Sequence, residues 1–371
     1  MKKYLISGIG PGSTGVGRLM NQLAIESNKY KYTNIYNFAS QSVRKLLDEK
    51  KYMQLIAEVI RRLFSSIIFH LQINRINDSE VILIYPQGIG LKNFKKLMIN
   101  NKVIKIYIMD NSFFCMKSYN YINGECLKCI DNFENYDASC SPLPRPFRIK
   151  DYTQFIKFLK SNITNVNLFV QSQSHKFLVQ RVYGQDIAVT VIGMNTGEFD
   201  FKQKNKKQKQ KQRNKKTIVF HNHLIDSKGF QFALDLAIKL EEYNFIFPSK
   251  KTKNINCYDN IKYLDITWDN GLKELVIDAD LILCLSMWST PIEGSLVKSI
   301  YYNGNVAVMD NQFGFNTEMP NNAVLKLRYD LSIAMKQIDD FMQNTDLDYS
   351  YHSMKWLKKT YANYEVSKLF S

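Results

Sequence analysis

Short apolar runs alternate with longer amphipathic segments along the chain, and residues 280–315 show the pattern most clearly. Leu281–Leu285 has the length and composition of a buried parallel strand, and the polar turn Ser286–Gly294 follows it. Ser295–Tyr302 then has helical spacing, and Val306–Met309 is a second apolar run. The loop thus joins the carboxyl end of a strand to the start of a helix, where open α/β sheets bind ligands and helix N–H groups suit an anion. An ordinary βαβ unit is the alternative.

The same alternation continues along the whole chain. Other apolar runs typical of strands lie at Lys3–Gly8, Asn34–Phe38, Val81–Tyr85, Val103–Met109, Leu168–Gln171, Val189–Val191, Thr217–Phe220, Phe245–Phe247 and Ile261–Leu264. Because helical segments separate these strands, the pattern predicts an α/β fold with parallel, doubly wound sheets. We expect two Rossmann-like domains that face each other across a cleft.

A basic segment near the middle of the chain sets the predicted domain boundary. Lys202–Lys216 holds 9 of the 50 Lys and Arg residues and no acid, a composition typical of a solvated linker. We therefore predict an N-terminal domain at 1–200, a linker at 201–216 and a C-terminal domain at 217–350. A C-terminal helix at 351–371 is expected to pack back toward the N-terminal domain.

Composition limits the classes of partner. The chain has 371 residues, 45% hydrophobic and 23% charged, which indicates a globular protein with room for two cores. The net charge of +16 calls for an anionic partner: phosphorylated substrates, an anionic membrane face or nucleic acid. We expect no nucleic-acid partner, because the charge lies in the linker and scattered helices and no nucleic-acid module is recognisable.

The sequence shows no targeting or spanning segment. The N-terminus runs directly into a strand without a signal-peptide pattern, and no apolar stretch approaches about 18 residues. Six cysteines in such a chain favour a reducing cytoplasm. Ile56–Leu71 is predicted to be a core-facing helix, and a helix in a membrane interface is the alternative. We expect a cytoplasmic protein, with the inner face of the plasma membrane as a second location.

A glycine-rich turn follows the first strand. Its glycines are Gly8, Gly10, Gly12, Gly15 and Gly17. Gly12 and Ser13 are predicted to approach a bound donor closely, because glycine lets the backbone come near a ligand; a tight turn without a ligand is the alternative. The spacing also fits a dinucleotide fingerprint. The second strand, however, is followed by residues 39–41, Ala-Ser-Gln, without the acid that would hold a ribose, so NAD is not expected.

Four cysteines lie within a predicted insertion at 115–140. Cys115, Cys126, Cys129 and Cys140 have the spacing C-x10-C-x2-C-x10-C. Four thiolates can hold a structural zinc ion in tetrahedral geometry, so we predict such a site. Free thiols are the alternative.

Four stretches resemble one enzyme family. They read ISGIGPGSTGVGRLMNQL, YIMDNSFFCMKSYNYINGECLKC, IVFHNHLIDSKGF and LILCLSMWSTPIEGSLVKSIYYNGNVAVMDNQFGF. Together they resemble the two-domain GT-B glycosyltransferases, especially the retaining group that uses nucleotide-sugar donors. The resemblance implies sugar transfer from a nucleotide sugar to a lipid-linked glycan acceptor in bacterial surface polysaccharide, such as O-antigen or capsule. A catalytically degenerate protein that binds a partner is the alternative.

The resemblance also implies roles for individual residues. Lys228 would neutralise the donor diphosphate, and His223 would donate a hydrogen bond where the family has arginine. Glu293 would hold the donor hydroxyls and Asp110 would serve the acceptor, as the two catalytic residues. The backbone N–H groups expected to bind phosphate belong to Gly294, Ser295 and Leu296.

The chain also departs from the family's pattern. Asn222 and His223 replace a Gly-Arg pair, and Ser299 and Pro291 stand where its two glutamates are expected. Each of these residues also has an interpretation without a ligand. Lys228 and Glu293 would then be surface residues, His223 would be a histidine at a strand end, and Asp110 would cap a turn.

Overall fold

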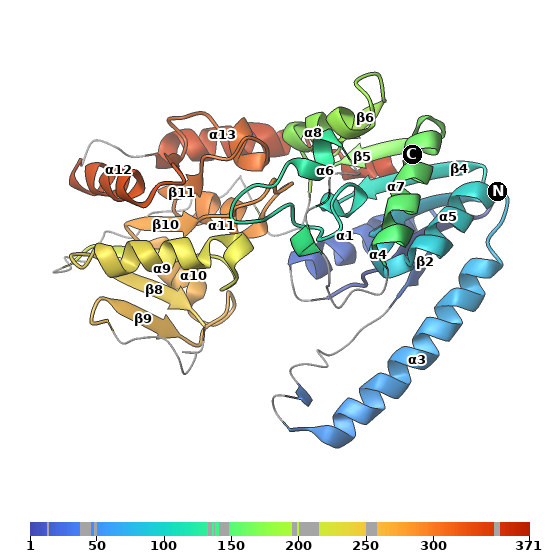
Figure 1. Ribbon diagram of the computed structural model, residues 1–371, viewed down its shortest axis with the longest axis horizontal. Helices are drawn as coiled ribbons and strands as arrows, with labels where there is room; N and C mark the ends of the chain where they lie inside the picture. Colours follow the sequence, from blue (N-terminus) through green and yellow to red (C-terminus); the bar gives the residue numbers. More distant parts are fainter. Residues whose placement is uncertain are drawn as a thin grey trace.

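The chain forms two parallel sheets. The computed structural model describes residues 1–12, 15–37, 46–47, 50–132, 136, 138–140, 148–194, 199, 215–249, 258–344 and 349–371. Within them lie two six-stranded sheets, ordered β2-β1-β3-β4-β5-β6 and β12-β11-β10-β7-β8-β9, in which every pairing is parallel. Figure 1 shows the two sheets with their helices as separate halves of the molecule. The predicted α/β fold with two Rossmann-like domains is confirmed.

The first domain is built from the first half of the chain. Its strands are β1 Lys3–Ser7, β2 Thr33–Tyr36, β3 Glu80–Ile84, β4 Val103–Ile108, β5 Asn167–Val170 and β6 Val189–Val191. Its helices are α1 Gly15–Lys29, α3 Tyr52–Asn74, α4 Pro86–Ile89, α5 Leu91–Asn100, α6 Lys128–Asp131, α7 Ile149–Asn162 and α8 Gln173–Tyr183. Short 3-10 turns lie at η1 Asn111–Phe113, η2 Ala138–Cys140 and η3 Ile163–Asn165. Strand β3 is buried along its whole length, as expected for a central parallel strand.

The second domain repeats the design. Its strands are β7 Thr217–Phe220, β8 Asn244–Pro248, β9 Ile261–Leu264, β10 Leu281–Cys284, β11 Val306–Met309 and β12 Leu325–Leu327. Its helices are α9 Phe230–Lys239, α10 Leu272–Asp278, α11 Gly294–Tyr302, α12 Leu331–Gln343 and α13 Ser350–Ala362. The 3-10 turns are η4 Asp226–Lys228, η5 Phe315–Glu318 and η6 Val366–Leu369. The strand, loop, helix and strand predicted at 280–315 are confirmed.

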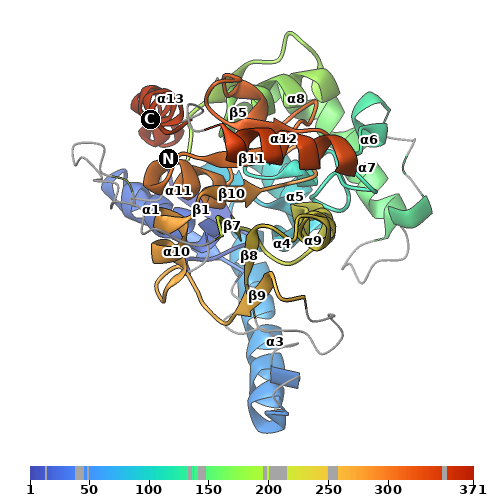
Figure 2. The ribbon, with the colours of Figure 1, turned by 90° about the vertical axis from the view of Figure 1, so that its left-hand side faces the viewer.

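The end of the chain returns to the first domain (Figure 2). Phe370 is fully buried, and its ring stacks on Tyr30 with centroids 5.8 Å apart. The backbone oxygen of Ser371 accepts a hydrogen bond of 2.6 Å from the Lys105 ammonium, which also pairs with Glu80 at 2.7 Å. The tail therefore ties the second half of the chain to strands β3 and β4. The basic segment 201–214 lies outside the described residues, so the exact domain boundaries stay predictions.

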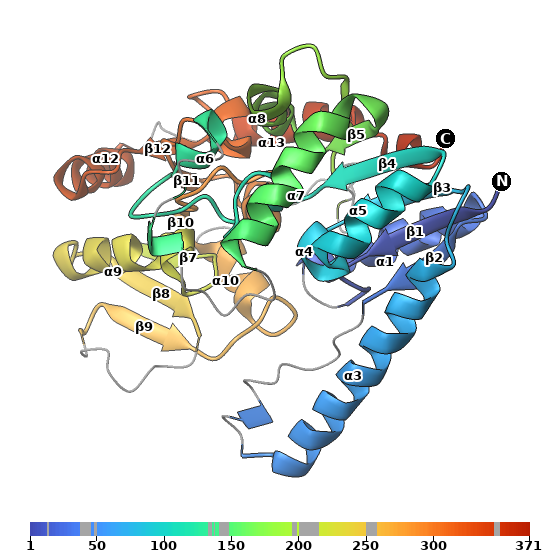
Figure 3. The ribbon, with the colours of Figure 1, turned by 45° about the vertical axis from the view of Figure 1, so that its right-hand side comes forward.

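Helix α3 does not face the core. Figure 3 shows it extending away from both sheets, and only Phe69 and Ile73 near its end, with Glu58, are buried. The prediction of a core-facing helix at Ile56–Leu71 is therefore wrong for most of its length. Helical spacing shows that one face is apolar, but it does not show what that face contacts. Within the described part of the chain, no helix is long and apolar enough to cross a bilayer.

Candidate functional site

The sheet topology of the second domain brings two loops together. Strands β7 and β10 are neighbours, but the chain leaves β7 toward β8 and β9 and leaves β10 toward β11 and β12. At such a switch point the connections diverge, so a crevice opens beyond the carboxyl ends of the two strands. His221 and Asn222 follow β7 there, and the loop Ser286–Glu293 follows β10. The switch point therefore coincides with the stretch that the sequence pattern predicts to bind an anion.

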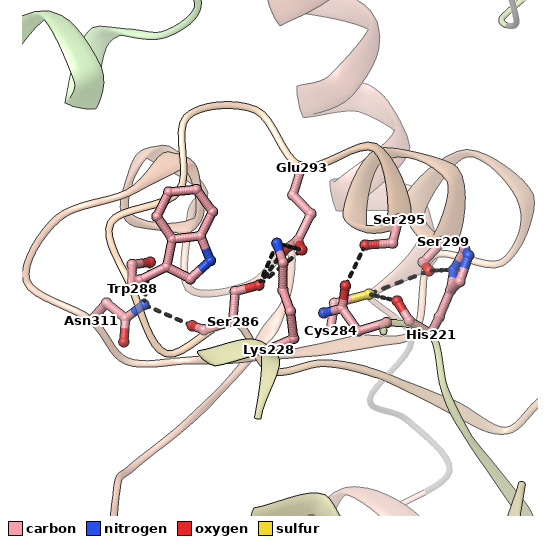
Figure 4. A network of polar contacts seen from close by, with 10 residues as sticks. His221, Lys228, Cys284, Ser286, Trp288, Glu293, Ser295, Ser299 and Asn311 are labelled. Atoms are coloured by element: carbon pink, nitrogen blue, oxygen red, sulfur yellow. Dashed lines mark hydrogen bonds and ion pairs between the residues drawn. The ribbon is translucent and has the colours of Figure 1, made fainter. Parts of the chain in front are cut away.

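Glu293, Lys228 and Ser286 form a compact polar cluster at this switch point (Figure 4). The Lys228 ammonium lies 2.5 Å from Glu293 Oε1. The Ser286 hydroxyl lies 2.8 and 2.7 Å from the two carboxylate oxygens. Glu293 is only 7% exposed, and a buried carboxylate needs such a counter-charge. The alternatives of a surface lysine and a surface glutamate are therefore wrong.

A glycine fixes the position of Lys228. Gly229 follows it with φ +80° and caps the start of α9. A Cβ atom at Gly229 would lie 2.2 Å from the Leu285 carbonyl oxygen, so only glycine fits here. The Met287 N–H donates to the Ser227 carbonyl at 3.0 Å, which joins this turn to the loop after β10. Lys228 thus reaches Glu293 because two loops share a backbone contact.

The first turn of α11 points into the same region. Gly294, Ser295 and Leu296 open the helix behind its N-cap residue Glu293. The first backbone N–H groups of a helix lack partners inside it and carry the positive end of its dipole. The Ser295 hydroxyl donates to Asn222 Oδ1 at 3.0 Å, which holds the helix start against the end of β7. The predicted phosphate-binding N–H groups therefore lie beside the Lys228 cluster.

His221, which the sequence analysis did not select, is the buried histidine at the end of β7. Its Nδ1 lies 2.8 Å from the Ser299 hydroxyl, and its ring stacks on Trp268 at 5.2 Å. Burial, assisted by the charge of Lys298, lowers the pKa of His221 to about 3, so the ring is neutral. The predicted ligand His223 is exposed instead. The two histidines differ by two positions, and only the placement of α11 against the strand distinguishes them.

Two basic side chains from different domains face each other beside this site. Lys298 on α11 lies 4.6 Å from the Trp268 ring centroid, and Arg18 on α1 pairs with Asp269 at 3.1 Å. Burial, with the nearby charge of Arg18, lowers the pKa of Lys298 to about 8. Asp269 partly offsets the repulsion between the two cations, and a bound anion would offset it further. The start of α1 follows the glycine turn, so that turn and the helix start of α11 lie on facing domains.

The glycine turn itself is held by contacts within the first domain. The Gly12 N–H donates to the Gly17 carbonyl at 3.1 Å, and a Cβ on Gly17 would lie 2.7 Å from the Gly12 backbone. Gly12 is exposed at this turn, and Ser13 lies outside the described residues. The glycines are thus explained by close backbone packing, and the predicted donor contact of Gly12 stays a prediction.

Asp110 lies on the first domain's side of the interface. Its carboxylate accepts from the Ser112 N–H at 2.9 Å and caps the turn after β4. Tyr119 lies near it, packed edge-on against Trp288 at 4.5 Å. Burial raises the pKa of Tyr119, and the charges of Asp110 and Glu293 add to the rise. The carboxylates of Asp110 and Glu293 therefore both lie within electrostatic range of the Tyr119 hydroxyl. Asp110 also caps a turn, as the alternative interpretation expects.

The four cysteines of the insertion surround one small cavity. Cys115, Cys126, Cys129 and Cys140 all line a space of about 10 Å³, and Cys115 and Cys140 are buried. None of these four thiols is joined in a disulfide. Among the described residues, however, no group of three ligands is placed to hold a metal ion. The donor set suits zinc, but the positions of the sulfur atoms do not confirm the zinc prediction.

Comparison with solved structures identifies the architecture. Sucrose-phosphate synthase from Thermosynechococcus elongatus superposes with a TM-score of 0.61 at 8% identity, covering 99% of this chain and 96% of that protein. HepE from Anabaena, solved with UDP and glucose, gives 0.56 at 11% identity over 99% and 97%. A glycosyltransferase from Rickettsia africae gives 0.54 at 14% identity over 100% and 96%.

The chain has the GT-B fold. The match extends over both domains and nearly the full length of each neighbour, so it includes the arrangement of the two sheets. No family model and no curated protein sequence matches the chain. In this GT-B chain the Lys228 cluster therefore has to be interpreted from its own geometry.

Proposed function

We propose that the protein is a glycosyltransferase that moves a sugar from a nucleotide-sugar donor to a glycan acceptor. The observation that carries this proposal is the cluster of Lys228, Glu293 and the α11 helix start at the switch point of the second domain. A helix start and an ammonium group offer positive charge to a diphosphate leaving group, and Glu293 offers acceptor atoms to sugar hydroxyls. HepE, a neighbour of the same fold, was solved with UDP and glucose, which supports a uridine nucleotide as the first donor to test.

The roles of the two domains follow from this placement. Lys228 and Lys298 would stabilise the charge that develops on the departing diphosphate, and Arg18 would add charge from the first domain. Asp110, within electrostatic range of Tyr119, would position the acceptor hydroxyl. Because Glu293 and Lys228 are paired at 2.5 Å, donor hydroxyls must share or replace part of that contact. We propose a retaining reaction with a lipid-linked acceptor in bacterial surface polysaccharide synthesis, such as O-antigen or capsule, at the inner membrane face.

A panel of nucleotide sugars tests the proposal. Thermal shift selects the donor, and chromatography then measures nucleotide release with and without glycan acceptors. Lys228→Gln is expected to reduce nucleotide release at least 100-fold, with Lys262→Gln on the exposed side of β9 as the matched control. The anomeric configuration of the product, measured by NMR, decides between retention and inversion. No binding and no release with any nucleotide sugar would overturn the proposal.

A second candidate is a GT-B protein without catalysis that binds a partner. The observation that favours it is Ser299, whose hydroxyl is held by His221 at 2.8 Å where the resembling enzymes carry a glutamate. Copurification of an active transferase, together with a donor site that binds no nucleotide by calorimetry, would favour this candidate.

A further inference from the structure

Helix α3 presents an apolar face to solvent. Its 23 residues span roughly 35 Å at 1.5 Å per residue. Ten large apolar side chains on it are exposed, from 42% for Val59 to 80% for Met53. They are Tyr52, Met53, Ile56, Val59, Ile60, Leu63, Phe64, Ile67, Ile68 and Leu71. An exposed apolar patch of this size marks a surface that binds a partner, either another protein or a membrane.

Near its end the helix is anchored in the core of the first domain. Phe69 and Ile73 are buried in the core of the first domain, and Asn74 Oδ1 accepts from the Lys96 ammonium at 2.8 Å. The preceding turns extend away from the sheet (Figures 1 and 3). The apolar side chains of these turns are therefore accessible to a partner.

The distribution of charge favours a bilayer as the occupant. Glu58 is the one acid of the helix, and it pairs with both Arg61 at 2.8 Å and Arg62 at 2.9 Å. The helix therefore keeps a net positive charge in a chain of +16. Lys50 and Lys51 immediately precede it, but Asp48 and Glu49 before them offset their charge, so the surplus on the helix comes from Arg61 and Arg62. Basic residues beside an apolar face attract anionic lipid headgroups, at about 1 kcal/mol for each well-placed cation.

The width of the apolar face favours lipid over a second helix. At 100° per residue the ten side chains cover about half of the helix circumference. A two-stranded coiled coil needs only a narrow seam of two positions in seven. A helix lying in a membrane interface buries a face of this greater width to a depth of about 5–10 Å. Since no described helix can span a bilayer, the helix would lie on the membrane.

We infer that the apolar face of α3 inserts into the interface of an anionic membrane and docks the first domain there. This inference rests on the proposed function, because docking would bring the enzyme to its acceptor only if that acceptor is lipid-linked. Docking by this helix would hold the first domain, and with it Asp110, beside the membrane from which such an acceptor extends.

Vesicle binding tests the docking without any sugar transfer. The full chain is floated with vesicles of phosphatidylcholine alone and with vesicles containing 30% phosphatidylglycerol. We expect at least tenfold tighter binding to the anionic vesicles and a further tenfold loss at high salt. The variant Ile60→Glu/Leu63→Glu/Ile67→Glu is expected to lose binding at least tenfold. The variant Ile25→Glu/Ile99→Glu/Ile333→Glu changes equally exposed side chains elsewhere and is expected to bind like the parent.

A second measurement reports insertion directly. Tryptophan at Phe64→Trp should shift its emission to the blue and be quenched by brominated lipid, whereas Ile333→Trp should do neither. Unchanged binding by the α3 variant would overturn the inference, as would a dimer that the α3 substitutions dissociate. A protein that transfers sugar to a soluble acceptor but ignores vesicles would overturn docking alone. One that binds vesicles but has no donor would overturn only the proposed function.

Discussion

At the scale of single residues, the candidate site depends on charged side chains that are buried or partly buried. Glu293 is buried and its ion pair with Lys228 neutralises it, whereas Lys298 is partly buried within range of the charges of Arg18 and Asp269. A buried ion pair contributes little net stability, but loss of one partner costs about 3–5 kcal/mol. The pair therefore makes the site sensitive to substitution at either member, and Lys298, whose pKa is lowered to about 8, is the better probe of ligand binding.

Nucleotide binding should weaken as the pH rises through the pKa of Lys298. Its pKa is lowered to about 8, so the ammonium is charged at pH 7 and mostly neutral at pH 9. A bound diphosphate favours the charged form, so affinity is retained below pH 8 and lost above it. Calorimetry with UDP from pH 7 to 9 should show a decline of about tenfold, since one pKa unit corresponds to 1.36 kcal/mol. Lys298→Met should bind more weakly at pH 7 and lose most of this pH dependence, whereas an unaltered decline in that variant would contradict the assignment.

At the scale of elements, the sequence predicts buried units better than exposed ones. Strand β10, helix α11 and strand β11 were predicted within a residue, because a strand buried on both faces is apolar at every position. Helix α3 has equally regular spacing, yet its apolar face is exposed. Periodicity reports that a face is apolar, and only the tertiary arrangement decides what covers it.

The candidate site was predicted only in part. Lys228 was selected because Lys228-Gly229 matches a motif of the resembling family, and Glu293 because it lies in the polar turn before a predicted helix start. His221 was missed because nothing local distinguishes it from His223, and its burial comes from Ser299 and Trp268, which lie far along the chain. Contacts between segments that lie far apart in the chain produce no recognisable residue spacing in the sequence.

The cysteine insertion carries an element-scale prediction. If Cys115, Cys126, Cys129 and Cys140 hold zinc, the sulfur atoms must lie about 2.3 Å from the metal, so these side chains around their shared cavity would have to move. We predict one zinc per chain by elemental analysis of protein purified without added metal. Cys126→Ser/Cys129→Ser should lose the metal and lower the melting temperature, whereas Cys284→Ser, in the second domain, should keep the metal. Protein without stoichiometric zinc whose four thiols react freely with a thiol reagent would contradict the prediction.

At the scale of the whole molecule, two buried histidines should make the protein sensitive to acid. Burial lowers the pKa of both His175 and His221 to about 3, far below the ordinary value of 6.5. The unfolded chain therefore binds more protons below pH 6.5, and the free energy of unfolding falls as the pH falls from 6.5 toward 3. At pH 5 the loss is roughly 2 kcal/mol per histidine.

Urea unfolding at pH 7.5, 6 and 5 measures this acid sensitivity. The variant His175→Leu should lose about half of the pH dependence, because one of the two buried rings no longer titrates. His352→Gln changes an exposed histidine and should leave the dependence as it is. An identical acid dependence in the parent and His175→Leu would show that other groups control it.

The two domains are joined by polar contacts around the loop that carries the candidate site. Glu125 of the first domain accepts from the Gln312 N–H at 2.7 Å and the Phe313 N–H at 3.1 Å, and it also bonds the Ser289 hydroxyl. Asn120 forms two further hydrogen bonds with Ser289. Segment 115–140 thus contacts the loop after β10 and connects the two domains.

Glu125→Ala should therefore loosen the contact between the domains. It leaves the N–H groups of residues 312 and 313 without their acceptor, at a cost of about 1–3 kcal/mol. We expect a lower urea midpoint and a larger radius of gyration by X-ray scattering, with donor affinity reduced because the loop is no longer held. Glu241→Ala removes an exposed acid away from this contact and should change neither quantity. If Glu125→Ala kept the parent's radius and midpoint, the insertion would be an appendage rather than a connection between the domains, and the donor loop would have to be positioned by the second domain alone.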